Sequence, residues 1–401
     1  MTTIAVIGTF DTKGAEHAFV AERIRKTGHQ TLLIDVGTLG EPTIQPDVTR
    51  EEVAQAGDHD LAALTERRDR GASVKAMSES APILLAKLVA EKRIHGVISL
   101  GGGGGTSIAT SAMRALPIGF PKLMVSTLAS GNTAQYVGVK DIVMMPSIVD
   151  VAGLNRLSRQ IFSRAAGAIC GMVEVESPEA GDRPLIVASQ FGNTTECVDE
   201  ARRLLEEAGY EVLVFHSTGM GGRTMESLIE SGMVTGVLDV TTTEWADEVV
   251  GGVLSAGPTR LETAARHGVP AIVAPGCLDM ANFNAPETVP SKFDGRNFYE
   301  HNPQVTLMRT TPEECRELGE RIAEKLNSSL APVSFLIPRQ AISVISAPGQ
   351  SFHDPEADQA LFEALRENLR DDIPVRELDC EINDPAFAKA CVDELLKNLG
   401  R

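Results

Sequence analysis

The sequence predicts an α/β protein built from two Rossmann-like, doubly wound parallel-sheet domains. Short apolar runs alternate with helical patterns along the 401-residue chain, as in repeated βαβ units. The βαβ unit at the N-terminus returns in the second half of the chain with ungapped spacing. A polar stretch containing Pro and Gly, residues 176–184, separates the two copies. We therefore expect domains at 1–180 and 181–401, related by internal duplication.

The first βαβ unit occupies the N-terminal 36 residues. Residues 4–7 are an apolar run of the kind that a parallel strand buries on both faces. Residues 17–24 carry core-type positions at the i, i+3, i+4, i+7 spacing of a helix. Gly28 is placed to end that helix, and residues 31–36 predict a second strand.

The second copy begins with an apolar strand at residues 185–188. Phe191 and Gly209 stand where the first copy has Phe10 and Gly28, at one constant offset. Because any two βαβ units look alike in outline, general fold similarity is the alternative to duplication.

Both halves continue with further strand and helix patterns. Strands are expected at 95–100 and 122–126 in the first half, and at 235–240 and 271–274 in the second. A helix over 155–175 is expected to close the first domain.

Two insertions and a C-terminal segment complete the chain. Residues 37–75 are polar and predict a surface excursion of the first domain. Residues 276–304 contain three prolines and little periodicity, which is typical of a long functional or disordered loop. Residues 354–400 predict two amphipathic helices around a strand at 374–378.

The composition excludes several classes of function. With 55 Asp and Glu against 37 Lys and Arg, the net charge of -18 repels nucleic-acid backbones and anionic membranes. Aromatic residues make up only 4%, too few for a platform on which bases stack. The six cysteines form no CxxC pair and the chain starts without a signal-peptide pattern, so we expect a cytoplasmic protein without a metal site.

Ligands of open α/β sheets bind at the carboxyl ends of strands, so candidate residues are expected at these ends. After the first strand come Thr9, Asp11, Thr12 and Lys13, which run into a helix. The free amides of a helix N-terminus favour an anion, and Lys13 adds a positive charge. A helix cap followed by a solvated lysine is the alternative explanation.

A run of five glycines follows the strand at 95–100. Such a run is costly in chain entropy and is explained when backbone amides must approach a phosphate closely. Thr106 comes next, where its hydroxyl can cap the helix or bond a phosphate oxygen. A flexible loop without a ligand is the alternative. The five residues are Gly101, Gly102, Gly103, Gly104 and Gly105.

A third polar strand end follows residues 122–126. Ser130, Gly131 and Asn132 supply small polar groups that can complete the cradle, and an ordinary turn explains them nearly as well.

The second domain also carries titratable groups at or after its strand ends. Each of them is more often structural when considered alone, so they predict an acid-base site only if they converge. The candidates are Asp239, Glu244, Cys277, Asp279 and His301.

Four separated motifs of the chain are GTFDTKG at 8–14, LGGGGGTS at 100–107, STLASGN at 126–132 and HNPQVTLMRTTPEE at 301–314. Together they resemble the Tm-one-like ATP-binding domain family over the whole chain. That resemblance implies two Rossmann-like domains, ATP bound in the first domain, and a homodimer.

We therefore expect an ATP-binding protein whose Gly-rich loops hold the nucleotide at the interdomain cleft. Lys13 would neutralise phosphate charge and Asp11 would hold Mg²⁺ or order water. Three functions stay open at this point. One is an ATP-dependent enzyme acting on a small metabolite, and another is a non-catalytic, nucleotide-gated protein-interaction module. The third is an enzyme on a small phosphorylated metabolite, for which ATP is incidental.

Overall fold

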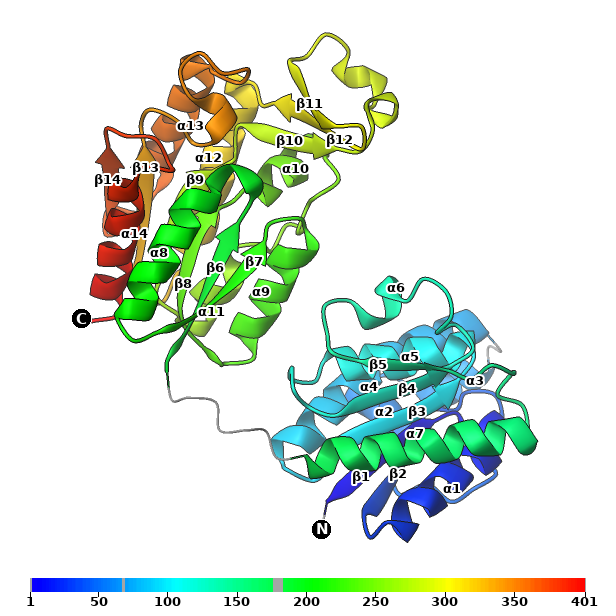
Figure 1. Cartoon of the computed structure of the whole chain (residues 1–401). Helices are drawn as coiled ribbons and strands as arrows, with labels where there is room; N and C mark the ends of the chain where they lie inside the picture. Colours follow the sequence, from blue (N-terminus) through cyan, green and yellow to red (C-terminus); the bar gives the residue numbers. More distant parts are fainter. Residues whose placement is uncertain (1, 67–68, 176–182, 401) are drawn as a thin grey trace. The chain divides into compact units, whose positions relative to one another are not determined.

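The computed structural model describes residues 2–66, 69–175 and 183–400. The chain divides into two compact units, unit 1 (Met1–Pro178) and unit 2 (Glu179–Arg401), shown in Figure 1. Most of the expected linker at 176–184 lies outside the described residues. No described helix is both long and apolar enough to cross a membrane.

Unit 1 is built on a parallel sheet in the order β2-β1-β3-β4-β5. Ile7 of β1, the second strand in this order, pairs with Ile34 on one side and with Ser99 on the other. The strands are β1 (Thr3–Gly8), β2 (Gln30–Asp35), β3 (Gly96–Gly101), β4 (Lys122–Ser126) and β5 (Val143–Pro146).

Helices cover both faces of this sheet because successive strand residues point to opposite sides. Ile4 and Val6 pack with α1 and α7, whereas Ala5 and Ile7 pack with α2, α4 and α5. The helices are α1 (Phe10–Lys26), α2 (Arg50–Ala56), α3 (Leu61–Glu66), α4 (Arg70–Ala90), α5 (Gly103–Arg114), α6 (Ala134–Val137) and α7 (Arg156–Glu174).

The segment 37–75 is more than the polar surface excursion that its composition predicts. It contains α2, α3 and the start of α4, and it places Val48, Val53 and Ala54 in the core of unit 1. The composition of this segment does not reveal its core residues, because only a few apolar residues face the sheet and polar residues surround them in the sequence.

Unit 2 has a six-stranded parallel sheet in the order β14-β13-β9-β8-β6-β7. Counted along each unit, both sheets share the order 2-1-3-4-5, and unit 2 adds a sixth strand. The doubly wound fold is confirmed, whereas internal duplication stays a prediction. The strands are β6 (Leu185–Gln190), β7 (Glu211–His216), β8 (Val234–Thr241), β9 (Ala271–Gly276), β13 (Val333–Pro338) and β14 (Val375–Leu378).

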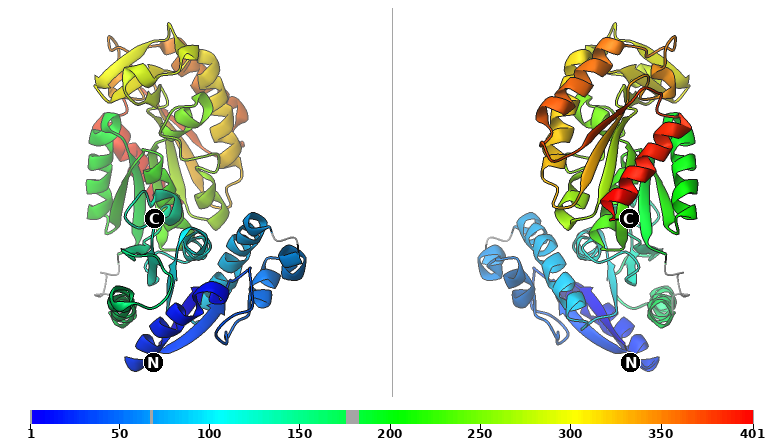
Figure 2. Two further views of the ribbon diagram at one scale, coloured as in Figure 1. Left: turned by 90° about the vertical axis from the view of Figure 1, so that its right-hand side faces the viewer. Right: turned by 90° about the vertical axis from the view of Figure 1, so that its left-hand side faces the viewer.

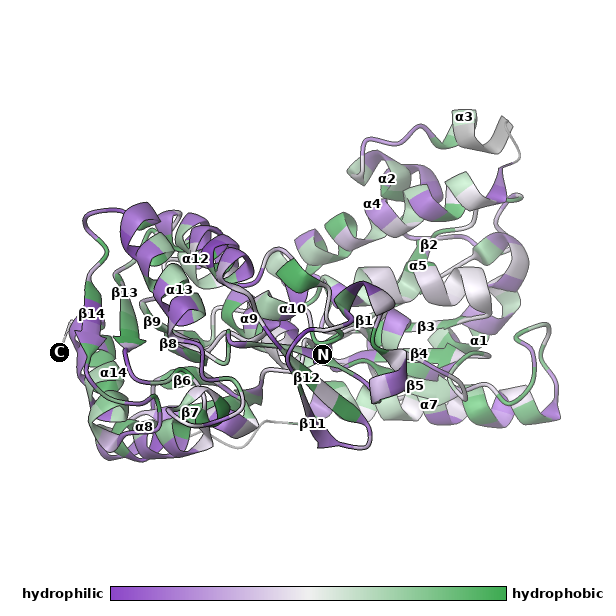
Figure 3. Ribbon diagram, turned by 90° about the horizontal axis from the view of Figure 1, so that it is seen from above, coloured by the Kyte–Doolittle hydropathy of each residue, from purple (hydrophilic) through white to green (hydrophobic). Residues whose placement is uncertain are grey.

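The helices of unit 2 also lie on both faces of its sheet (Figure 2). Leu205 of α8 and Leu395 of α14 share one core. Ile229 of α9 and Leu326 of α12 line the other face. In Figure 3 hydrophilic (purple) and hydrophobic (green) residues alternate along the helices, as expected of helices with one buried side. The helices are α8 (Thr195–Glu207), α9 (Met220–Glu230), α10 (Glu244–Val250), α11 (Glu262–His267), α12 (Pro312–Asn327), α13 (Pro355–Asn368) and α14 (Pro385–Asn398), with 3-10 turns η1 (Gly192–Thr194) and η4 (Val344–Ser346).

The expected irregular loop at 276–304 is instead part of a small antiparallel sheet, so that prediction is wrong. Its order is β10-β12-β11, and Ala281 pairs with Met308. The first two strands of this sheet pair with residues 305–309, which follow them in the chain. Local periodicity within 276–304 cannot reveal that pairing. The elements are β10 (Met280–Phe283), η2 (Pro286–Thr288), η3 (Ser291–Phe293), β11 (Phe298–Asn302) and β12 (Val305–Arg309).

Candidate functional site

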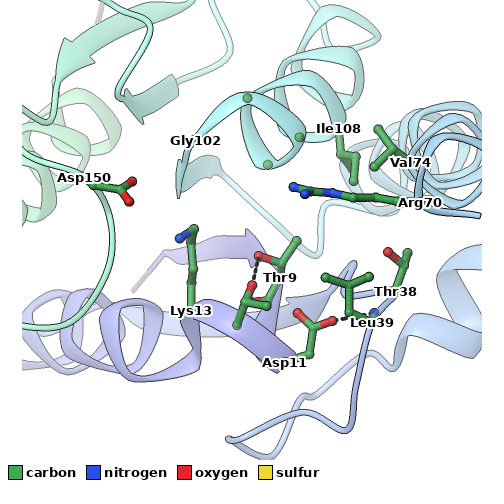
Figure 4. Close-up of a pocket in the computed structure, with 14 residues that line it drawn as sticks. Thr9, Asp11, Lys13, Thr38, Leu39, Arg70, Val74, Gly102, Ile108 and Asp150 are labelled. Atoms are coloured by element: carbon green, nitrogen blue, oxygen red, sulfur yellow. Dashed lines mark hydrogen bonds between the residues drawn. The ribbon is translucent and has the colours of Figure 1, made fainter. Parts of the chain in front are cut away.

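A cavity of about 350 Å³ opens in unit 1 at the carboxyl ends of β1 and β3 (Figure 4). The winding of the sheet reverses between these two neighbouring strands, which is where doubly wound folds bind ligands. All of its lining residues belong to unit 1. They are Thr9, Asp11, Thr12, Lys13, Thr38, Leu39, Arg70, Val74, Gly102, Gly103, Gly104, Gly105, Ile108 and Asp150.

The N-terminus of α5 presents unpartnered amides to this cavity. Gly102 is its N-cap and has no side chain to cap the helix. The first N–H groups of a helix lack intrahelical acceptors, and within the described residues nothing accepts from Gly103, Gly104 or Gly105. By contrast, the Asn155 side chain caps α7. The open end of α5 is therefore suited to an anion.

The glycines of this loop differ in how much space a side chain would have at each position. A Cβ on Gly101 would sit 3.1 Å from the Cα of Gly105, so close packing accounts for Gly101. A Cβ on Gly103 would meet nothing within 4 Å, and on Gly104 nothing nearer than 3.7 Å. None of these glycines has a positive φ. Gly103 and Gly104 thus keep open the space in front of the amides.

The start of α1 forms the opposite wall. Its first amide, that of Phe10, donates to the Oδ1 atom of Asp35 at 3.0 Å. Lys13 departs from helical geometry with φ -136° and ψ 27°, and its ammonium donates to the carbonyl oxygen of Val151. In Figure 4 the Lys13 side chain faces Asp150 at one end of the cavity. The expected positive charge is therefore on the wall.

Asp11 holds the loop that follows β2. Its Oδ2 atom accepts hydrogen bonds from the amides of Leu39 at 2.7 Å and Gly40 at 3.2 Å. Its Oδ1 atom is buried and has no hydrogen-bond partner in the part of the chain that the structure describes. The carboxylate therefore shapes the cavity wall, which is a role that the sequence did not predict.

Arg70 is a lining residue that sequence reasoning missed. It is exposed at the start of α4, and its Nη2 atom lies 3.8 Å from the position of a Cβ on Gly104. Across the described ranges, no hydrogen bond or ion pair holds its guanidinium, which points into the cavity in Figure 4. Nothing in the surrounding sequence marks this arginine, since only the fold brings α4 to the glycine loop.

Thr106 lies beneath the loop and does not line the cavity. Its buried hydroxyl shares a hydrogen bond of 2.7 Å with Ser126 at the end of β4. Of the third strand end, Ser130 lines a neighbouring cavity. The Gly131 amide donates to Leu128 in a turn, and Asn132 accepts from Ala134 at the start of α6. These four residues therefore do not contact the 350 Å³ space.

Asp239 and Glu244 of unit 2 meet at one buried arginine. The Nη1 and Nη2 atoms of Arg260 donate to Asp239 at 2.6 and 2.7 Å, and its Nε atom donates to Glu244 at 2.8 Å. Glu226 adds a third carboxylate at 3.2 Å. Since Arg260, Asp239 and Glu244 are buried and paired with one another, they form an internal ion-pair cluster, which Glu226 joins from its edge.

At the carboxyl ends of β6 and β8, polar side chains of unit 2 bond to one another and to nearby amides. The hydroxyls of Thr194 and Thr241 share a hydrogen bond of 2.7 Å across the ends of β6 and β8. The carboxylate of Glu244 accepts amide hydrogen bonds from Gly219 and Gly222 at 2.7 and 3.0 Å, at the N-terminus of α9. A carboxylate of the protein itself thus occupies the amides at the start of α9.

The remaining candidates of unit 2 do not join the Arg260 cluster. Burial raises the pKa of the Cys277 thiol well above its usual value and also raises that of Asp279, which accepts from Ser343 at 2.7 Å. His301 is exposed on β11. Among the described residues, no hydrogen bond or ion pair links these side chains to Arg260, so the expected convergence is not seen.

Two family models together match almost the whole chain. The "Uncharacterised protein family (UPF0261) N-terminal domain" matches residues 2–178, and the corresponding C-terminal domain matches residues 183–399. The chain belongs to the UPF0261 family. A UPF0261 protein from Clostridium tetani is 51% identical over 395 residues, covering 98% of each chain.

The UPF0261 chain is also similar to a tomato protein. The ToMV resistance protein Tm-1(GCR237) of Solanum lycopersicum is 38% identical over 414 residues, which cover 98% of this chain and 55% of that protein. Homology to the Tm-one-like proteins is therefore confirmed. Among solved structures, a UDP-N-acetylglucosamine 2-epimerase from Rickettsia bellii is 12% identical with a TM-score of 0.22, over 67% of this chain and 78% of its own.

Proposed function

We propose that unit 1 binds ATP, with the polyphosphate at the N-terminus of α5. The observation that carries this proposal is that the amides of Gly103, Gly104 and Gly105 face an open cavity and have no acceptor within the described part of the chain. Backbone amides at a helix N-terminus are a common phosphate site. The net charge of -18 does not oppose it, because the local donors act at short range.

Two cations flank these amides. They favour a ligand with several linked phosphates rather than a single anion. Lys13 lies at one end of the cavity, and Arg70 lies beside Gly104 at the other. Among the described residues the Arg70 guanidinium has no hydrogen-bond or ion-pair partner, so it can take two phosphate oxygens at once. The terminal phosphate is expected at Lys13, because the apolar surface lies at the Arg70 end.

That apolar surface would take the nucleobase. Leu39, Val74 and Ile108 line the end of the cavity that lies away from Lys13. The volume of about 350 Å³ falls within the range of ligand pockets, roughly 300–1,000 Å³. Thr38 supplies a hydroxyl group at the apolar end of the cavity. The edges of the nucleobase would therefore meet few polar groups there.

Mg²⁺ fits this arrangement through Asp150. The ion prefers one or two carboxylates together with phosphate oxygens and water. Asp150 is exposed, lines the cavity opposite Lys13 and makes no ion pair among the described residues. Asp11 is the weaker candidate because amides already occupy one of its oxygens. The homodimer and the cytoplasmic location stay predictions.

The test is calorimetric titration of the full chain with ATP and Mg²⁺. Gly103→Val should abolish binding while the protein stays folded, because the new side chain would fill the space in front of the amides. Gly167→Val is the matched control, since Gly167 is a helical glycine of α7 with open space around its Cβ position. Equal ATP affinity in both variants would refute the phosphate site.

A further inference from the structure

A second cavity adjoins the first at the carboxyl ends of β4 and β5. It has a volume of about 280 Å³, and Asp150 lines both cavities. The two also approach each other at Thr127, whose Oγ1 atom lies 3.8 Å from the position of a Cβ on Gly102. A molecule in this second cavity would therefore lie beside the Lys13 end of the first. Its lining residues are Thr127, Ser130, Ser147, Ile148, Val149 and Asp150.

Ile148 lines this cavity from a strained turn. The Val149 amide donates to the Ser147 carbonyl at 2.7 Å, which makes Ile148 the centre of a three-residue turn. The φ angle of Ile148 is +64°, a left-handed value that a β-branched side chain rarely adopts. The Ser147 hydroxyl donates to the Val149 carbonyl at 2.7 Å and holds the turn in place.

Neither folding nor packing accounts for isoleucine at this position. Its side chain is 72% exposed, so it gains little from burial. Glycine or asparagine would adopt the same turn with less strain. Strained residues gather at ligand sites because the surroundings hold them where a ligand needs them. The apolar surface of Ile148 is explained when a ligand covers it.

The lining groups define the chemistry of that ligand. Thr127 and Ser130 offer exposed hydroxyls, while Ile148 and Val149 offer apolar surface. Asp150 is the charged group among the lining residues and would repel an anion. The volume lies below the usual range for drug-sized ligands, so the molecule is small.

We propose that this cavity binds a small, neutral, polyhydroxylated molecule such as a monosaccharide or a linear polyol. Its hydroxyls bond to Thr127 and Ser130, and its C–H face packs on Ile148. The inference rests on the proposed function for the occupant of the neighbouring cavity, and it adds a second ligand to that site.

The test is ligand-observed NMR on the full chain without nucleotide. The probes are a panel of neutral monosaccharides and linear polyols on the wild-type chain, together with their phosphorylated forms on Gly103→Val, in which the phosphate site of the first cavity is blocked. Neutral members should bind the wild-type chain, and phosphorylated ones should bind Gly103→Val more weakly, because the phosphate meets Asp150. A panel in which nothing binds, or in which the phosphorylated forms bind better, would overturn the inference.

Variants of Ile148 separate ligand contact from folding. Ile148→Asn should weaken binding by about tenfold or more, since the apolar contact is lost. It should also raise the melting temperature, because asparagine tolerates positive φ. Ile83→Asn, at an exposed isoleucine of α4, is the matched control and should leave sugar binding unchanged. Equal binding by the two variants would contradict the proposed contact.

An ATP titration on the same proteins distinguishes the two proposals. Sugar binding without ATP binding would refute the proposed function alone. ATP binding with no member of the neutral panel bound would refute the second cavity alone.

Discussion

The hydroxyl groups of Thr106 and Ser126 share a buried hydrogen bond of 2.7 Å beneath the glycine loop. The same Ser126 hydroxyl accepts from the Leu128 amide at 3.0 Å. One bond thus joins the first turn of α5 to the end of β4 and fixes the height of the loop above the sheet. Thr106 acts as a positioning residue below the proposed phosphate site.

Thr106→Val should lower the free energy of unfolding by about 1–3 kcal/mol, because Ser126 loses a buried partner. The ATP affinity should fall less than in Gly103→Val, since valine at 106 does not enter the cavity. Chemical denaturation and calorimetry measure the two effects. If Thr106→Val were as stable as the wild type and did not bind ATP, the Thr106 hydroxyl would be a direct phosphate contact rather than a positioning group.

Lys13→Ala and Arg70→Ala should each weaken ATP binding by about ten- to a hundredfold, because a charge-assisted hydrogen bond contributes roughly 1.5–3 kcal/mol. Adenosine lacks phosphates, so its affinity should change little in either variant. Calorimetric titration with both ligands checks this. Arg23→Ala, at a basic residue in the last turns of α1 that does not line the cavity, serves as the control. If the affinities for ATP and adenosine fell equally, Lys13 and Arg70 would support the fold rather than contact phosphate.

His17 should make unit 1 sensitive to acid. Burial lowers the pKa of His17 from 6.5 to about 4, and its ring fills the space where Gly8 lacks a Cβ. The unfolded chain therefore binds the proton more readily, so this contribution is complete above pH 6.5 and is lost as the pH falls through about 4. The change in pKa corresponds to roughly 3 kcal/mol of unfolding free energy.

Denaturant unfolding at a series of pH values measures this dependence. His17→Phe keeps a ring in the same space and removes the titrating group, so its stability should fall less between pH 6.5 and 4. Parallel curves for the two proteins would show that other groups cause the acid sensitivity.

Arg260→Ala should destabilise unit 2 by about 3–5 kcal/mol, since Asp239 and Glu244 would stay buried without their cation. Arg203→Ala is the matched control. Arg203 pairs with Glu200 and Glu207 on the exposed side of α8, where water and salt screen ion pairs and leave them little effect on stability. Thermal unfolding compares the two, and a folded Arg260→Ala protein as stable as the control would show that the cluster is not structural.

Local sequence determined much of the architecture and one wall of the candidate site. The apolar run at 4–7 and the helical spacing of 17–24 predict β1 and α1, because a single element requires only its own periodicity. The glycine run and Lys13 follow strand ends, and Lys13 lines the cavity together with Gly102, Gly103, Gly104 and Gly105. These predictions succeeded since strand, loop and helix are contiguous in the chain.

Tertiary structure decided which polar groups meet and which are enclosed. Arg70 reaches the glycine loop only because α4 packs beside α5 on the same face of the sheet. Thr106 turns inward because Ser126, on the next strand, offers a partner. Glu244 is a candidate acid by sequence, yet the fold places Arg260 and the α9 amides around it. Pairing between distant segments depends on packing across the whole sheet, so no window of sequence contains it.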